Sequence, residues 1–307
     1  MKISIIGGGG RVGSNAAFAL QCAGLVNEIA LVDANADVAA GEALDILHGT
    51  SLAGDQRIYA ADTKGVADSE IICITAGLRR KPDESRLDLI NRNVTLYKGI
   101  LDSLRSVNVR KDAVFVVVSN PVDILTRLNI EYLSWPEKQV IGLGTVLDTT
   151  RFRSLIAAMR GLPPTQVDAL ILGEHGDTMT PIWSSATAAG MALTKLLTPQ
   201  QQADIFSRTQ KSGAEVIRLK GGAGYAVGLS IARVIHAIAL DQKLILPVSS
   251  RINGVYGIRK VCLSLPTVVG RHGVEAVLEP ELWPKEVAGL TASARTLEET
   301  WTKISGK

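Results

Sequence analysis

Short apolar runs alternate with helical patterns through the first half of the chain. The apolar runs are continuous rather than interrupted by polar residues, which is typical of parallel strands covered on both faces. These runs are residues 3–6, 29–32, 71–75, 114–118 and 140–142, and the segments with the period of an amphipathic helix are 12–23, 38–47 and 86–104. This order of strands and helices predicts an α/β fold, a doubly wound parallel sheet of the Rossmann type.

The pattern changes in the second half, where long helices become dominant. The elements expected there are a helix over 148–159, a strand over 167–172, helices over 199–220 and 227–240, and a charged amphipathic helix over 291–304. We therefore predict two domains, the Rossmann domain over 1–143 and a mixed α+β domain over 144–307.

Composition excludes several classes of protein. The 33 Lys and Arg residues are nearly balanced by 30 acids, and aromatic residues make up 4%, which is not the pattern of a nucleic-acid-binding protein. The chain enters directly into a predicted strand and has no long apolar span, so we expect a cytoplasmic protein without a membrane partner. Its three Cys and four His residues lie apart at spacings that predict no metal site.

The first predicted strand leads into Gly8-x-Gly10-x-x-Gly13 and then into a helix. Backbone N–H groups at a helix N-terminus can face a phosphate, and glycines allow a pyrophosphate to approach closely. We predict that this loop, including Arg11 and Val12, binds a dinucleotide. Four consecutive glycines would also be compatible with a flexible turn.

Asp33 favours the dinucleotide interpretation. It follows the second predicted strand, about 20 residues after the glycines, where such folds place an acid on the adenosine ribose. Its carboxylate can accept hydrogen bonds from the ribose hydroxyls and would repel a 2′-phosphate. The predicted cofactor is therefore NAD rather than NADP.

Five further segments need one explanation, and their order and spacing are more specific than the glycine loop. They are Thr75-Ala76-Gly77 with Arg79-Arg80-Lys81-Pro82, Glu84-Ser85-Arg86, Ser119-Asn120-Pro121, Leu147-Asp148-Thr149-Thr150-Arg151-Phe152-Arg153, and Gly173-Glu174-His175-Gly176-Asp177. With these segments the chain resembles the lactate/malate dehydrogenase family over essentially its full length. The resemblance implies an NAD-binding domain, a substrate domain, and reversible hydride transfer between a 2-hydroxy acid and a 2-oxo acid.

His175 is the predicted proton carrier. Hydride transfer at an alcohol carbon needs a group that removes the hydroxyl proton and returns it in the reverse reaction, which favours an imidazole. Only His175 lies in a Gly-Glu-His-Gly-Asp turn after a buried strand, although a purely structural turn histidine would show the same pattern. The resemblance implies that His175 is the family's proton donor and that Asp148 orients it.

Two arginines and an asparagine are the predicted substrate contacts. Arg151 follows Asp148 by one helical turn, where its guanidinium can hold a substrate carboxylate; a surface ion pair is the alternative. The resemblance implies that Arg86 closes over the substrate and polarises its carbonyl, and that Asn120 contacts substrate and nicotinamide ribose. The cofactor contacts predicted outside the glycine loop are Asp33, Thr75, Ala76, Gly77, Asn93, Val118 and Asn120.

The resemblance aligns Arg80 with the position that sets substrate specificity, where malate enzymes have arginine and lactate enzymes typically glutamine. A second substrate carboxylate requires a second cation, and such a pair at about 4 Å and an effective dielectric near 20 is worth roughly 4 kcal/mol before desolvation. Ala223 also favours malate, because lactate enzymes usually have threonine at the aligned position. We therefore expect a malate dehydrogenase of the tricarboxylic acid cycle, acting on the dicarboxylic pair malate and oxaloacetate.

Other features favour lactate. Glu84 aligns with an acid more typical of lactate enzymes and could partly neutralise Arg80. The segments 144–148, 173–177 and 263–266 also resemble lactate enzymes. L-lactate dehydrogenase on the same scaffold is therefore the alternative.

The resemblance also bears on control and assembly. Bacterial lactate enzymes activated by fructose 1,6-bisphosphate resemble this chain at Arg153, but the histidine that completes their phosphate site is Asp168 here. A carboxylate would repel the phosphate, so we expect no such activation. Family members commonly form dimers or tetramers, so a homo-oligomer, a homotetramer or a dimer, is expected.

Two other classes of protein stay open. Short-chain reductases use Tyr-x-x-x-Lys, which Tyr256 and Lys260 match, although Gly257 and the strand-like run 261–265 argue against a catalytic helix. A non-catalytic NAD-binding regulator would keep the glycine loop without the chemistry. The presence of His175 with its predicted partners argues against that class.

Overall fold

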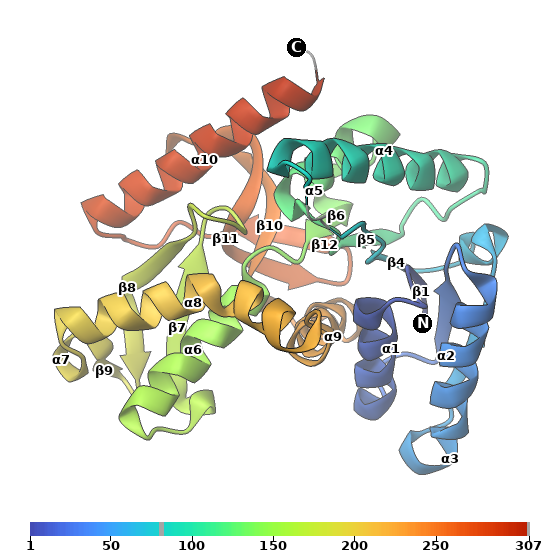
Figure 1. Ribbon diagram of the computed structural model, residues 1–307, viewed down its shortest axis with the longest axis horizontal. Helices are drawn as coiled ribbons and strands as arrows, with labels where there is room; N and C mark the ends of the chain where they lie inside the picture. The colour runs from blue at the N-terminus through green and yellow to red at the C-terminus, as the bar shows by residue number, and fades with distance from the viewer. Residues whose placement is uncertain (80–82, 306–307) are drawn as a thin grey trace.

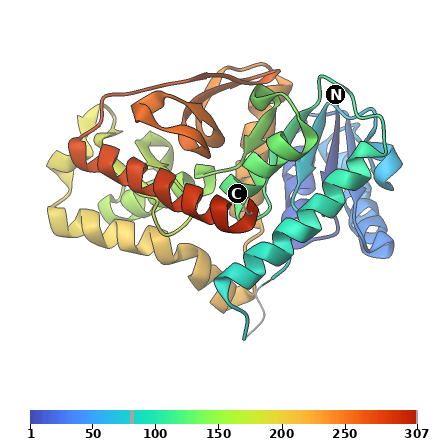
Figure 2. The ribbon, with the colours of Figure 1, turned by 90° about the horizontal axis from the view of Figure 1, so that it is seen from above.

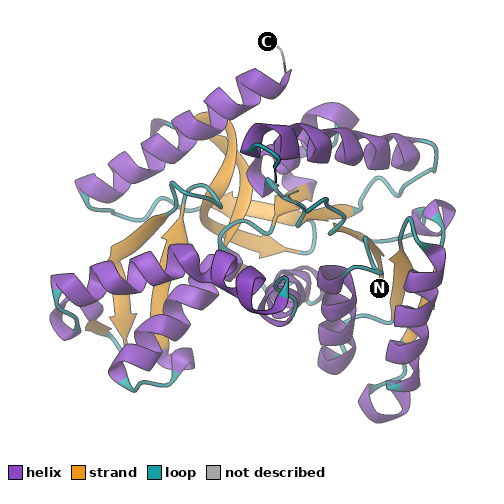
Figure 3. Ribbon diagram, viewed as in Figure 1, coloured by secondary structure: helices purple, strands orange, loops and turns teal. Residues whose placement is uncertain are grey.

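The computed structural model of the protein describes residues 1–79 and 83–305. A central sheet is flanked by helices, and a smaller group of strands and helices lies beside it (Figures 1 and 3). Within the described ranges, no helix has both the length and the hydrophobicity that a membrane span needs.

In the described ranges the central sheet has nine strands, of which the first six along the chain pair in parallel. In order across the sheet they are β12 (Gly273–Val277), β11 (Arg259–Gly270), β10 (Leu244–Asn253), β6 (Val140–Gly142), β5 (Val114–Val117), β4 (Ile71–Ile74), β1 (Lys2–Ile6), β2 (Glu28–Val32) and β3 (Arg57–Ala60). The direction of strand order reverses between β1 and β4, as in a doubly wound fold. The predicted fold class is confirmed.

Helices cover both faces of this sheet (Figures 1 and 2). One face packs against α1 (Arg11–Ala23), α2 (Ala36–His48) and α9 (Tyr225–Ala239), with α3 (Thr50–Ala53) beyond them, and the other packs against α4 (Arg86–Arg105), α5 (Val122–Leu133) and α10 (Pro284–Ser305). Each strand must therefore be apolar on both sides.

The side chains of β4 illustrate this requirement. Ile71 and Cys73 belong to the core under α1 and α9, whereas Ile72 and Ile74 belong to the core under α4 and α5. All four are fully buried. The alternation of a strand thus gives each core an apolar side chain, which explains the uninterrupted hydrophobic runs.

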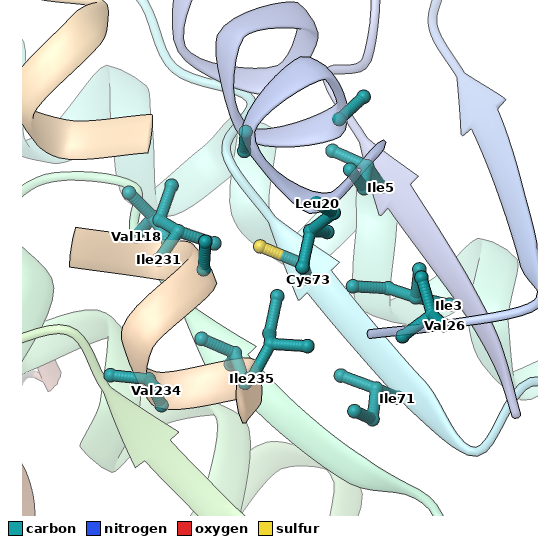
Figure 4. Packing of buried hydrophobic residues seen from close by; sticks show 14 of the residues in the cluster. Ile3, Ile5, Leu20, Val26, Ile71, Cys73, Val118, Ile231, Val234 and Ile235 are labelled. Carbon is teal, nitrogen blue, oxygen red and sulfur yellow. The ribbon is translucent and has the colours of Figure 1, made fainter. Parts of the chain in front are cut away.

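Helix α9 belongs to the second predicted domain but packs on the first. A Cβ added at Gly228 would lie 2.8 Å from the Asn15 carbonyl oxygen of α1, so only glycine permits this approach of the two helices. Ile231 and Ile235 lie against Leu20 and the β4 side chains (Figure 4). Burial of each isoleucine contributes about 1.5–3 kcal/mol.

The remaining elements form a separate layer around a third core. They are β7 (Val167–Leu172), β8 (Thr180–Ala188) and β9 (Met191–Ala192), which form an antiparallel sheet, with α6 (Val146–Arg160), α7 (Leu193–Leu196) and α8 (Pro199–Lys220). Helix α6 begins soon after β6 and packs beside β7. Asp148 lies in the first turn of α6 and His175 follows β7, so these elements position two of the three predicted catalytic residues.

Candidate active site

The loop after β1 meets the loop after β4 where the strand order reverses. A Cβ added at Gly7 would lie 2.5 Å from the backbone nitrogen of Ala76. The Thr75 hydroxyl donates hydrogen bonds to the carbonyls of Ile6, at 3.2 Å, and Gly7, at 3.1 Å. The predicted cofactor segments at 8–13 and 75–77 are thus adjacent, at the place where α/β sheets of this kind bind ligands.

The glycine loop is closely packed and leaves the start of α1 open to an anion. A Cβ at Gly13 would lie 2.3 Å from the Gly7 carbonyl oxygen, so a side chain there would force the turn apart. Helix α1 has no side-chain cap and no acid in its first turn. Its first N–H groups can therefore bind the pyrophosphate of a dinucleotide.

Asp33 lies beside this loop with its carboxylate partly solvent-accessible. Oδ2 accepts a hydrogen bond from the Gly9 backbone at 3.0 Å, and Oδ1 accepts one from Asn35 at 3.1 Å. A carboxylate can accept further bonds from two ribose hydroxyls. The residues present therefore fit the adenosine half of NAD.

Several predicted cofactor contacts already have protein partners. The Arg11 guanidinium donates to the carbonyls of Lys220, at 2.7 Å, and Gly222, at 2.9 Å. The side-chain oxygen of Asn93 accepts a hydrogen bond from the Leu78 backbone at 2.7 Å. Val118 is buried, and the roles of these residues and of Val12 in cofactor binding stay predictions.

The end of β5 connects the predicted cofactor loops to the turn that holds His175. The Ser119 hydroxyl donates to the Ala76 carbonyl at 2.5 Å, and the exposed Asn120 follows, joined to Pro121 by a cis peptide bond. In the first turn of α5, Asp123 Oδ2 accepts a hydrogen bond from the His175 backbone at 2.8 Å. One short segment thus contacts both halves of the predicted site.

His175, Asp148 and Arg151 form one hydrogen-bonded group. Asp148, 1% exposed in the first turn of α6, has its Oδ2 2.5 Å from His175 Nδ1 and its Oδ1 3.0 Å from an Arg151 Nη1. The carboxylate therefore holds a hydrogen on Nδ1 and leaves Nε2 to exchange a proton. The imidazole is 23% exposed, so it is accessible to a substrate.

This arrangement favours the charged pair. Burial lowers the pKa of His175, but the charge and hydrogen bond of Asp148 outweigh it, so the pKa of His175 lies above its ordinary value. Burial raises the pKa of Asp148, while His175 and Arg151 bring it below its ordinary value. The imidazole is thus held ready to donate a proton.

Arg86 approaches the same turn from the other side. It is the first residue of α4, and its guanidinium forms ion pairs with Asp177 and, at 3.6 Å, with Glu174. The Arg86 side chain is 62% exposed. Arg86 thus contacts the residue before His175 and the second residue after it, and its exposed guanidinium can reorient toward a substrate.

The substrate-specificity argument rested mainly on Arg80, which lies outside the described part of the chain. Glu84, which was expected to offset its charge, forms an ion pair with Arg92 at 2.5 Å. Arg153, expected at an effector site, pairs with Asp168 at 2.7 Å and also donates to the Ala169 carbonyl at 2.8 Å. Its cation is therefore already neutralised within the chain.

The short-chain reductase interpretation does not fit the geometry. Tyr256 lies in a 3₁₀ turn with a φ of +50°, and Lys260 lies in β11, so the two are not on one helix. The Tyr256 hydroxyl donates to the Pro280 carbonyl. Burial raises the pKa of Tyr256 to about 12, which makes it a poor proton carrier at neutral pH.

Three residues at the site were not predicted as site residues. Glu174 and Asp177 flank His175 and pair with Arg86, and both belong to the quoted motif. Asp123 contacts the His175 backbone from a different element. The signal for Asp123 was an acid three residues after the Asn120 motif, within the first turn of an apolar helix.

Comparison with known proteins agrees with this geometry. Residues 1–142 match the family model of the lactate/malate dehydrogenase NAD-binding domain, and residues 145–306 match that of the α/β C-terminal domain. The chain is 39% identical to an L-lactate dehydrogenase of Synechococcus sp. (strain JA-3-3Ab), with 99% of each chain covered. It is 39% identical to an L-lactate dehydrogenase of Acetivibrio thermocellus, over 97% of this chain and 95% of the relative.

Two solved structures are also similar to this chain. The minor L-lactate dehydrogenase from Enterococcus mundtii, crystallised in a ligand-bound form, superposes with a TM-score of 0.94 at 33% identity, covering 99% of this chain and 98% of that one. A lactate dehydrogenase enzyme from a Medee basin deep-sea metagenome library gives 0.95 at 31% identity with the same coverage.

These names correct the expected substrate. The expectation of malate, and with it of a dicarboxylic substrate and the tricarboxylic acid cycle, is wrong, because these full-length relatives at about 39% identity are L-lactate dehydrogenases. The charge argument from Arg80, with Ala223 in support, was too narrow, since one cation does not define a complete carboxylate site.

The cofactor and the class of reaction follow from the same matches. The NAD-binding domain covers the glycine loop and Asp33, so NAD is the cofactor, and the enzyme is an NAD-dependent 2-hydroxy-acid dehydrogenase. With matches to both family domains, which together span nearly all of its 307 residues, the chain belongs to the lactate/malate dehydrogenase family.

Proposed function

We propose that the protein is an L-lactate dehydrogenase that interconverts lactate and pyruvate with NAD. The observation that supports this most strongly is the group of Asp148 with His175 and Arg151, in a chain that is 39% identical to named L-lactate dehydrogenases along its whole length. This group can hold one carboxylate and exchange one proton. Pyruvate has one carboxylate and one carbonyl.

The two arginines have different tasks in this proposal. Arg151 is fixed by Asp148 and is 17% exposed, so its remaining N–H groups can hold the substrate carboxylate with two parallel hydrogen bonds. Arg86 is more exposed and can move from Asp177 toward the substrate carbonyl, where its charge stabilises the developing alkoxide. Asn120 supplies a further polar contact at the end of β5.

The proton moves at His175 Nε2. In pyruvate reduction the protonated imidazole donates this proton to the carbonyl oxygen, and in lactate oxidation the neutral imidazole accepts the hydroxyl proton. Asp148 keeps the ring oriented and stabilises its charged form throughout. The chemistry that NAD supplies when bound is the transfer of a hydride to or from the substrate carbon.

The dinucleotide is held by the loops after β1, β2, β4 and β5 in this proposal. The predicted contacts are Gly8, Gly10, Arg11, Val12, Gly13, Asp33, Thr75, Ala76, Gly77, Asn93, Val118 and Asn120. Asp33 favours NAD over NADP because its carboxylate would repel a 2′-phosphate.

The test is the initial rate of NADH oxidation with pyruvate and with oxaloacetate, over a range of each acid. We expect kcat/KM to be higher with pyruvate, and a His175→Asn variant to lose both activities. A higher kcat/KM with oxaloacetate would overturn the lactate assignment. If the unmodified enzyme oxidised NADH with neither acid, the dehydrogenase mechanism itself would be overturned.

We also propose that the enzyme is a homo-oligomer. Large apolar side chains are exposed on helices that pack against one another, including Phe18 of α1 at 55%, Leu44 of α2 at 52% and Leu229 of α9 at 66%. A second copy of the chain would cover them. Light scattering after size exclusion distinguishes a monomer, which would contradict this proposal, from a dimer or tetramer.

A further inference from the structure

Asp123 is a second carboxylate beside the proton carrier. It is 2% exposed, and its Oδ2 accepts the backbone N–H of His175 at 2.8 Å. Asp148 approaches the same residue from α6, through the imidazole. His175 therefore lies between acids from two different helices, one bonded to its ring and the other to its backbone.

The carboxylate of Asp123 is poorly satisfied for a buried charge. Its Oδ1 and the nearby Ser249 Oγ, on β10, are both buried, and neither has a hydrogen-bond partner of normal geometry in the described parts of the chain. A neutral amide oxygen would accept the same backbone N–H without placing a charge in the core. Holding the turn therefore does not by itself require an acid at this position.

We propose that Asp123 is a positioning residue for His175, and that its buried charge acts with Asp148 to favour the proton-bearing form of the imidazole. This deepens the proposed function, since it concerns the proton that His175 exchanges with the 2-oxo or 2-hydroxy acid. Asp123 touches neither substrate nor cofactor in this proposal. It acts through His175 alone.

The charged groups around the pair agree with this role. His175 faces Asp148 and Arg151 from α6 and Asp123 from α5; Asp123 in turn faces Glu174, which precedes His175. Burial lowers the pKa of His175, and first Asp148 and then Asp123 raise it. Burial raises the pKa of Asp123 to about 6, while Ser249 and His175 lower it, so Asp123 is charged at neutral pH.

The test compares Asp123→Asn, which keeps an oxygen for the His175 N–H but removes the charge, with Asp112→Asn. Asp112 is exposed and paired with Arg110. It lies before β5, whereas Asp123 follows the other end of that strand. We measure pH profiles of kcat/KM for pyruvate reduction and lactate oxidation, and the titration of the His175 Cε1–H by NMR without substrate. The control is expected to follow the unmodified enzyme in all three.

In Asp123→Asn we expect the pKa of His175 to fall, because the nearby negative charge that favours the imidazolium is removed, and its protonated fraction near the midpoint to drop several-fold. Reduction is then lost at a lower pH, while oxidation just below the His175 midpoint of the unmodified enzyme becomes several-fold faster because more imidazole is neutral. A merely structural role would lower both rates, leave the midpoints unchanged, and overturn the proposal.

A second variant keeps the test independent of whether Asp123→Asn folds. Ser249→Ala removes the hydroxyl that lowers the pKa of Asp123, so Asp123 becomes neutral over more of the pH range and the same shifts follow in smaller size. The NMR titration separates this proposal from the proposed function. If pyruvate is not reduced but the His175 midpoint still moves with Asp123, only the lactate assignment fails.

Discussion

Asp148 Oδ2 lies 2.5 Å from His175 Nδ1, joining the first turn of α6 to the turn after β7. The same carboxylate binds Arg151 through its other oxygen, at 3.0 Å. One buried acid therefore orients the predicted proton carrier and the predicted carboxylate-binding arginine together. Any change at Asp148 should affect proton transfer and substrate binding at once.

Replacing Asp148 with asparagine tests that link. Asp148→Asn keeps the size of the side chain but removes the charge, so we expect kcat for pyruvate reduction to fall roughly 10²- to 10³-fold. The pKa of His175 should also fall, because Asp148 contributes most to raising it, and the alkaline limb of the reduction profile should move to lower pH. NADH binding, measured by fluorescence, should be unchanged, and an Asp102→Asn variant on α4 serves as control. An unshifted limb would contradict this account.

Arg86 is expected to matter for catalysis rather than for cofactor binding. Its guanidinium pairs with Asp177 and Glu174, from which it can turn toward the carbonyl. We expect Arg86→Gln to lower kcat roughly 10²-fold, the usual effect of removing one donor to a developing oxyanion. Arg105→Gln, at the other end of α4, is the matched control. Equal loss in both variants would indicate damage to the helix instead.

Asp33 is expected to set the choice between NADH and NADPH. Its carboxylate holds Gly9 and Asn35 and lies where a 2′-phosphate would be repelled. Asp33→Ser should raise the KM for NADH roughly tenfold, which corresponds to about 1.4 kcal/mol of lost binding. It should also narrow the preference for NADH over NADPH, because the charge that repels a 2′-phosphate is removed. Asp37→Ser, exposed in the first turn of α2, should change neither KM. An unchanged ratio of the two KM values would exclude Asp33 from the cofactor site.

Hydrophobic pattern predicted the elements that are apolar on both faces or strongly amphipathic. The predicted bounds 140–142, 167–172 and 199–220 coincide with β6, β7 and α8. The pattern did not predict β3, because this edge strand is short and Arg57 is exposed. It also did not predict α5, whose first nine residues are all buried and therefore lack the one-sided period of a surface helix.

The residues of the candidate site that lie within a sequence motif could be predicted. Contacts between elements that are distant in the sequence could not. His175, Asp148 and Arg151 were predicted and lie together. The contact of Asp123 with the His175 backbone depends on how α5 packs against the turn after β7, which no local spacing specifies. Substrate choice failed for a related reason, because a single charge at Arg80 does not describe a whole pocket.

Fructose 1,6-bisphosphate is expected to leave the enzyme unchanged. Arg153 pairs with Asp168 at 2.7 Å and donates a hydrogen bond to the Ala169 carbonyl. A phosphate would therefore have to displace the Asp168 carboxylate from Arg153. We expect the KM for pyruvate to be the same with and without the sugar bisphosphate. Asp168→Asn removes the repulsion and serves as comparison. A lower KM in the unmodified enzyme would contradict the prediction.

The buried charge of Asp123 should lower the free energy of unfolding at neutral pH. Burial raises its pKa from 3.8 to about 6, so above pH 6 the folded protein holds a charge that the unfolded chain would hydrate freely. Two pKa units correspond to about 3 kcal/mol, a loss that is absent below about pH 4 and grows until the pH passes the folded-state pKa. Asp123→Asn should therefore raise the free energy of unfolding at pH 7.5, by up to about 3 kcal/mol, and by a smaller amount near pH 4.5, where the penalty has only begun to grow.

Urea unfolding of both proteins between pH 4.5 and 8 measures this difference directly. Asp112→Asn is the control with the opposite sign, because the hydrogen bond from Arg110 lowers the pKa of Asp112 and removing that carboxylate cannot stabilise the fold. If Asp123→Asn destabilised the protein equally at every pH, the carboxylate would be a structural acceptor without a charge penalty. If the stabilisation grows as the pH rises toward 6 and then levels off, while reduction is weakened, the core keeps a costly charge because His175 needs it.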